Sequence, residues 1–167
     1  MEQKQKSILS FLLPYAIGLF LIRFIIDIIM KQFNLGYQGE SYGSFVALGV
    51  EIAIIFVCIN NYKKFRNNNE LKFTEGVRVG VGLMLIMGIL FTAYLTIHGK
   101  FIDPTYQEKI AQEAAKLLAE KNPTANIDQL TERKPNLAVG FFMSLLKYIF
   151  IGAFGGIICS AILKTEK

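Results

Sequence analysis

Apolar residues along this chain collect in four long blocks that are separated by polar connectors. The blocks cover about residues 8–30, 42–60, 73–98 and 137–163. A helix needs about 20 residues to cross the hydrocarbon core of a bilayer, so each block is long enough to span it. The pattern predicts an all-α integral membrane protein, a four-helix bundle that forms a single membrane domain over residues 1–167 with the lipid bilayer as its surroundings.

Basic residues flank these blocks unevenly. Eight of the 18 basic residues lie near the two termini or in the connector between the second and third blocks: Lys4, Lys6, Lys63, Lys64, Arg66, Lys72, Lys164 and Lys167. The short connector 31–43 holds only Lys31, and the long connector 99–136 balances six basic against six acidic residues. Because Lys and Arg are retained on the cytoplasmic side of membranes, we expect both termini in the cytoplasm.

Composition narrows the class of function further. The chain is 53% hydrophobic, with a mean hydropathy of +0.41 and a net charge of +5. Much of the positive charge flanks the apolar blocks, which favours an orientation signal over a nucleic-acid-binding face. Cys58 and Cys159 fall within apolar blocks, and no metal-ligand spacing or catalytic motif is present. We therefore expect no enzyme activity, no metal, no cofactor and no nucleic-acid partner.

The long connector carries a second helical pattern, between spans three and four. Asp103 is a typical N-cap and Pro104 a typical first helical residue, which predicts an outer helical segment at about 103–134. Apolar residues recur there on one helical stripe: Tyr106, Ile110, Ala114, Leu117 and Leu118. We expect this extracytoplasmic amphipathic helix either to cap the bundle or to lie on the lipid surface.

Ionisable residues interrupt the apolar blocks at one depth. Arg23 and Asp27 in the first block, Glu51 in the second and Lys147 in the fourth all fall at or just outside mid-membrane. A lone charge there costs about 2.5–3.5 kcal/mol on insertion scales, so each of the four should point inward and either meet an opposite charge or line a wetted pocket. We expect Arg23 and Lys147 to flank Glu51, while Asp27 can pair with Arg23 one helical turn away.

Hydroxyl groups in the third block are available to the same network, since Thr92, Tyr94 and Thr96 lie in its outer half. Two interpretations of the charges stay open. They serve only to fix helix register and pairing, or they form a site for a substrate, an ion or a proton.

Small residues recur every four positions in the last two blocks. The third block contains Gly76, Gly80 and Gly88, and the fourth contains Gly152, Gly156 and Ser160. Such ridges let helix backbones approach closely within a membrane. The pattern predicts helix packing through these residues, either inside the bundle or between two copies in a homo-oligomer.

Four segments together resemble a known family: Tyr62–Arg66, Phe73–Gly80, Phe101–Tyr106 and Gly152–Lys164. Their order is similar to that of the four-helix membrane family known as domain of unknown function number 4199. The resemblance covers nearly the whole chain. It implies a four-span fold in a bacterial inner membrane and carries no activity, substrate or catalytic residue.

Two functional hypotheses follow. The first is a non-catalytic accessory or scaffold protein of the bacterial cell envelope, whose outer segment 103–134 contacts another membrane or envelope protein. The alternative is a small transporter or ligand-binding bundle, in which Glu51 between Arg23 and Lys147 forms a charge-switching site.

Overall fold

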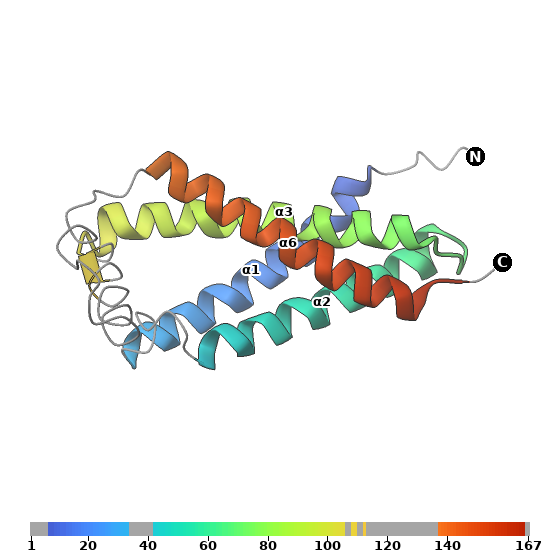
Figure 1. Ribbon diagram of the computed structural model, residues 1–167, viewed down its shortest axis with the longest axis horizontal. Helices are drawn as coiled ribbons and strands as arrows, with labels where there is room; N and C mark the ends of the chain where they lie inside the picture. Colours follow the sequence, from blue (N-terminus) through green and yellow to red (C-terminus); the bar gives the residue numbers. More distant parts are fainter. Residues whose placement is uncertain (1–6, 34–41, 106–107, 110–111, 113–136, 166–167) are drawn as a thin grey trace, which may run out of the picture.

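Four long helices make up most of the protein. The computed structural model describes residues 7–33, 42–105, 108–109, 112 and 137–165 (Figure 1). The helices are α1 (Ile8–Gln32), α2 (Tyr42–Arg66), α3 (Phe73–Ile97) and α6 (Leu137–Leu163), and a π-helical turn, η1 (His98–Ile102), extends α3. No strand occurs in these ranges, so the predicted all-α four-helix fold is confirmed.

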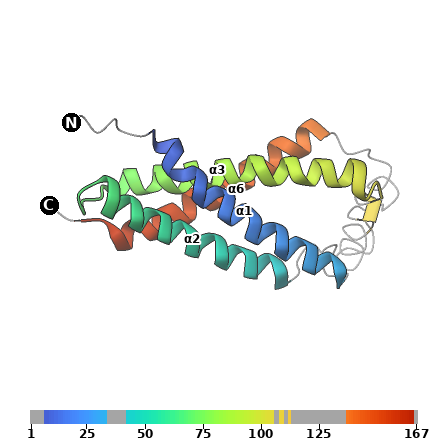
Figure 2. The ribbon, with the colours of Figure 1, turned by 180° about the vertical axis from the view of Figure 1, so that it is seen from behind.

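The helices form a bundle in which α3 occupies the central position. It packs most closely against α6 and also contacts α1 and α2, while α2 contacts α1 and α6. Seen from the two sides in Figures 1 and 2, α1 begins and α6 ends at one end of the bundle, next to the junction of α2 and α3. We call this the terminal end, and the opposite end, where α2 and α6 begin, the far end.

The surface of the bundle is strongly apolar. Large side chains such as Phe65, Phe45 and Phe150 are 76%, 71% and 70% exposed. The apolar windows of the four helices are only 17% to 39% buried, and the candidate membrane spans that contain them are 22 to 30 residues long. At ~1.5 Å per residue this length exceeds a hydrocarbon core of about 30 Å. Such a surface suits lipid and not water, as expected for four helices that are long and apolar enough to cross a membrane.

The predicted small-residue ridges meet inside the bundle, between α3 and α6. A Cβ atom on Gly80 would lie 2.8 Å from the carbonyl oxygen of Gly152 and 3.0 Å from the Cα atom of Gly156. A Cβ on Gly76 would overlap Ser160, and one on Gly88 would lie 2.8 Å from the Tyr148 ring. Only glycine therefore permits the approach of these two backbones.

Polar contacts join the helices at the terminal end. The backbone N–H of Leu71 donates to Thr165 Oγ1 at 3.2 Å, and the Thr165 N–H donates to the Leu71 carbonyl at 3.1 Å. Lys63 Nζ donates to the Leu163 carbonyl at 2.9 Å, and Arg66 donates to the Ser7 carbonyl. These acceptors explain why α2 continues to Arg66, beyond its predicted end near residue 60.

The predicted outer segment 103–134 lies mostly outside the described residues, and so do all five members of its apolar stripe: Tyr106, Ile110, Ala114, Leu117 and Leu118. At its start, Asp103 Oδ1 accepts hydrogen bonds from the backbone N–H of Thr105 at 3.2 Å and from its hydroxyl at 2.6 Å. A side-chain bond to the backbone N–H two residues further on is the contact that an N-cap makes, as predicted for Asp103. The amphipathic helix itself stays a prediction.

Replacing Gly80 with alanine should destabilise the bundle by about 1–3 kcal/mol, because the added methyl group meets backbone atoms of α6 that cannot move aside. The matched control is Gly49→Ala on α2, where nothing lies within 4 Å of the added atom. That variant should be neutral, or more stable by about 1 kcal/mol through its helix propensity. Unfolding in mixed detergent micelles measures both. Equal stability of the two variants would contradict this account of the contact between α3 and α6.

Candidate functional site

Three of the ionisable residues in the spans lie at one level of the bundle. Arg23 on α1, Glu51 on α2 and Lys147 on α6 are each three residues from the midpoint of their helix, toward the far end. At ~1.5 Å per residue the shared offset is about 4.5 Å from the middle of each helix. Residues distant in sequence are thus brought to the same depth by helices of similar length.

The facing stripes of α2 and α6 explain why a pocket forms at this level. A Cβ on Gly155 of α6 would lie 2.8 Å from Ile55 Cδ1 of α2, so the two helices touch there. Lys147 and Ile151 precede Gly155 by two turns and one turn, and Glu51 precedes Ile55 by one turn. Toward the far end the same two stripes therefore face each other across a gap.

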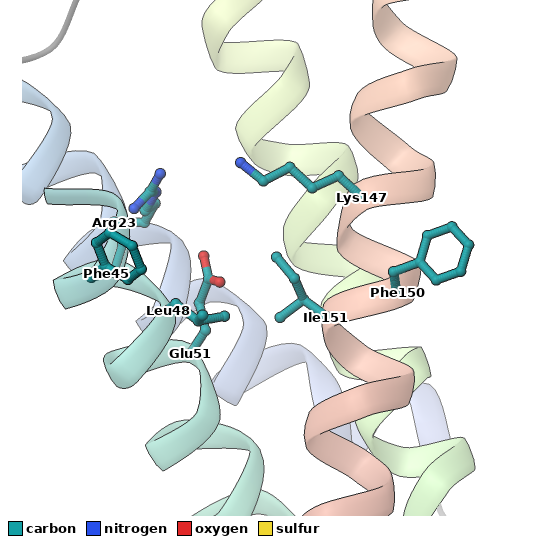
Figure 3. Close-up of a pocket in the computed structure, with 8 residues that line it drawn as sticks. Arg23, Phe45, Leu48, Glu51, Lys147, Phe150 and Ile151 are labelled. Atoms are coloured by element: carbon teal, nitrogen blue, oxygen red, sulfur yellow. The ribbon is translucent and has the colours of Figure 1, made fainter. Parts of the chain in front are cut away.

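That gap is a pocket with a volume of about 470 Å³ (Figure 3). Its size falls within the usual range for small-molecule sites. Three charged and five apolar residues line it: Arg23, Phe45, Ala47, Leu48, Glu51, Lys147, Phe150 and Ile151. The structure therefore brings three of the four predicted charges into one pocket and leaves Asp27 out of its lining.

Glu51 forms the floor of the pocket. It is only 4% exposed, and Figure 3 shows its carboxylate directed into the space between α1 and α6. Arg23 and Lys147 both act on it electrostatically. Among the described residues, however, neither cation forms a direct ion pair with Glu51. The predicted arrangement of two cations around one carboxylate is present, but the three charges remain separated by the pocket.

The guanidinium group of Arg23 contacts two aromatic side chains of the bundle interior, Phe91 and Tyr148. Its guanidinium carbon lies 5.4 Å from the centroid of the Phe91 ring, a distance that allows a cation–π interaction. It also interacts with the hydroxyl of Tyr148, which is buried against α3. Its Nε is buried without an acceptor within the described parts of the chain. This N–H is therefore left unsatisfied inside the bundle.

Lys147 lies at the mouth of the pocket, and this differs from the predicted inward orientation. The residue is exposed on the surface of the bundle, as are its neighbours in the lining Phe45 and Phe150. Figure 3 shows its side chain extending from α6 toward Arg23, across the opening above Glu51. The physical reason is that α6 turns its glycine ridge toward α3, which leaves the Lys147 stripe at the border between α2 and the surrounding lipid.

Asp27 belongs to a separate cluster nearer the far end. Its Oδ2 forms an ion pair with Lys31 Nζ at 2.7 Å and accepts a hydrogen bond from the Tyr94 hydroxyl at 2.9 Å. The expected partner was Arg23. Lys31 takes that place because it lies one turn further along the same face of α1, while the Arg23 guanidinium is turned toward the Phe91 ring.

Of the α3 hydroxyl groups that were predicted to be available to the charge network, those of Tyr94 and Thr96 form hydrogen bonds to α1 and within α3, respectively. Tyr94 bonds to Asp27, and its ring packs edge-on against Phe24, with centroids 4.9 Å apart. Thr96 Oγ1 donates to the Thr92 carbonyl at 2.8 Å, and Thr92 itself is buried. None of the three is among the residues that line the pocket.

The apolar walls of the site were not predicted from the sequence. Ala47 and Leu48 lie four and three residues before Glu51, and Phe150 and Ile151 lie three and four residues after Lys147. This spacing places them on the same helix faces as the two charges. These four apolar residues could have been identified from the sequence, because each lies one helical turn from Glu51 or Lys147.

The chemistry available in the pocket is the binding of a negatively charged group. Two cations and one carboxylate give the lining a formal net charge of +1. Among the described residues no cluster of His, Cys, Asp or Glu is suited to hold a metal ion. Five apolar neighbours surround the charges, so the site suits an anion that also carries apolar surface.

Comparison with known proteins identifies the family. Neither the curated proteins nor the solved structures include a match to this chain. A sequence profile of the family described as "Protein of unknown function (DUF4199)" matches residues 14–165. The match covers nearly all of the chain, includes all four long helices almost completely, and confirms the resemblance seen in the sequence. The protein therefore belongs to the DUF4199 family.

Proposed function

We propose that this protein is a non-catalytic accessory protein of the bacterial cell envelope, and that it works by holding an anionic ligand in the pocket between α1, α2 and α6. The single observation that carries the proposal is the composition of that pocket. Arg23, Glu51 and Lys147 share one level and one lining, yet they do not neutralise one another by direct contact.

The energetic argument favours binding over a purely structural role. Charges that only fix helix pairing should meet in hydrogen-bonded ion pairs, because separated charges at this depth are poorly compensated. Asp27 and Lys31 do meet in this way, at 2.7 Å. The three pocket charges instead face a space of about 470 Å³. An anion in that space would contact both cations and offset their excess positive charge.

The membrane placement is part of the proposal. The basic residues near the terminal end support an inner membrane location with both termini in the cytoplasm. The pocket would then open in the outer half of the membrane. The other predicted route to an accessory role, contact of segment 103–134 with an envelope protein, concerns residues mostly outside the described part of the chain and stays a prediction.

Removal of both pocket cations should release the ligand. We expect the protein purified from its native membrane in mild detergent to retain an anionic molecule that the double variant Arg23→Gln, Lys147→Gln loses. Mass spectrometry of the molecules that co-purify measures this. The matched control is Lys64→Gln, Lys72→Gln, which removes two basic residues exposed near the terminal end.

Both double variants should fold, as judged by helix content and a monodisperse elution profile. Retention of the same molecules by the wild-type protein and the pocket variant would show that the cations bind no ligand. The charges would then be structural.

Neutralising Glu51 should have the opposite effect on the ligand. Glu51→Gln removes the negative charge from the lining and raises its formal charge from +1 to +2. The affinity for an anion should rise about tenfold, which corresponds to ~1.4 kcal/mol of binding free energy. Retention of the anion through successive detergent washes measures this change. Glu108→Gln, at an exposed position outside the bundle core, is the matched control. Weaker retention in the Glu51 variant alone would indicate a cationic ligand and exclude the proposal.

A further inference from the structure

The mouth of the pocket opens on the side of the bundle that faces lipid. Phe45 on α2 and Phe150 on α6 belong to the lining and are 71% and 70% exposed, so they form the rim. Ala47 and Glu51, at 2% and 4% exposed, form the interior. The route from the surface into the pocket therefore passes between α2 and α6, within the span of both helices.

Lys147 makes this mouth unusual for a membrane surface. It is exposed, with aromatic neighbours on the rim, only three residues from the midpoint of α6. An ammonium group at that depth is costly when it faces hydrocarbon alone. Arg23, on α1, lines the same pocket. The two cations therefore require a negative group at the mouth, and the single carboxylate of Glu51 compensates for only one of them.

We infer that the anion is the headgroup of a lipid which enters the pocket sideways from the bilayer between α2 and α6. This inference rests on the proposed function and specifies its ligand class, an anionic lipid. The headgroup contacts Arg23 and Lys147, and an acyl chain lies along the exposed aromatic rim of Phe45 and Phe150. A guanidinium and an ammonium group together suit a phosphate, because both donate charge-assisted hydrogen bonds to its oxygens.

Lateral entry places the bound headgroup below the level of the neighbouring headgroups. Half of a hydrocarbon core is about 15 Å, so a headgroup bound about 4.5 Å from mid-membrane lies roughly 10 Å deeper than the headgroups around it. The side chains of Arg23 and Lys147 reduce this difference, since Figure 3 shows their charged ends above the Glu51 carboxylate, on the far-end side. The pocket lining has a formal net charge of +1, which favours an anionic over a zwitterionic headgroup at this depth.

Photocrosslinking in nanodiscs of defined composition tests the inference. The full chain is reconstituted in phosphatidylcholine that contains a small fraction of phosphatidylglycerol with a diazirine in its acyl chain. The control disc contains phosphatidylcholine with the same modified chain. We expect labelling of peptides around Phe45 and Phe150 with a preference for phosphatidylglycerol of about fivefold for each basic residue involved.

Variants distinguish the pocket from ordinary boundary lipid. Lys147→Gln removes the exposed cation without disturbing the buried core, and should lower the preference about fivefold, to the part that Arg23 supplies. Lys64→Gln, an exposed lysine on α2 at the terminal end, should preserve it. Excess glycerol 1-phosphate, the headgroup fragment without acyl chains, should not displace the lipid.

Each other outcome overturns the inference. Equal labelling by the two lipids would mean that the mouth holds boundary lipid only. Displacement by glycerol 1-phosphate would mean a soluble anion, which leaves the proposed function intact. Cross-links between copies of the chain at α2 and α6 would mean that a second copy covers the mouth. If no anionic molecule is retained in the co-purification experiment either, both the inference and the proposed function fail.

Discussion

The close contact of α3 with α6 determines most of the remaining structure. Gly80 meets Gly152 and Gly156 at distances that leave no room for a side chain, so the two helices can pack in only a narrow range of rotations. This contact turns the stripe of Lys147, Ile151 and Gly155 toward α2. Gly155 then touches Ile55, and the same stripe diverges from α2 at the level of Glu51. The pocket is therefore a consequence of glycine packing one to three turns away.

Charge compensation differs between the two clusters in the far half of the bundle. Asp27, Lys31 and Tyr94 satisfy one another at hydrogen-bonding distances, as expected for groups whose role is to hold α1 against α3. Arg23, Glu51 and Lys147 surround a cavity instead, and their lining keeps a formal charge of +1. Within one membrane bundle the first cluster stabilises helix pairing, while the second retains the capacity to bind an anion.

The terminal end is fixed by contacts of a different kind. Thr165 and Leu71 exchange backbone and hydroxyl hydrogen bonds, and Lys63 donates to the last carbonyl of α6, so the α2–α3 junction and the end of α6 hold each other. The pocket lies toward the opposite end, where α2 and α6 separate. The bundle thus combines a firmly joined terminal end with an opening between two helices at mid-depth.

The sequence alone determined the four spans, the small-residue ridges and the common depth of the charges, because span length, helical period and the cost of buried charge are local properties of the chain. It also indicated that Arg23 and Lys147 would lie around Glu51. Tertiary structure decided the rest. Arg23 turned to Phe91 and left Asp27 to Lys31, and Lys147 took the rim of the pocket. Those outcomes depend on how each helix is rotated about its axis against its neighbours. For α3 and α6 that rotation is restricted by the backbone contact at Gly80, Gly152 and Gly156, which no single span encodes.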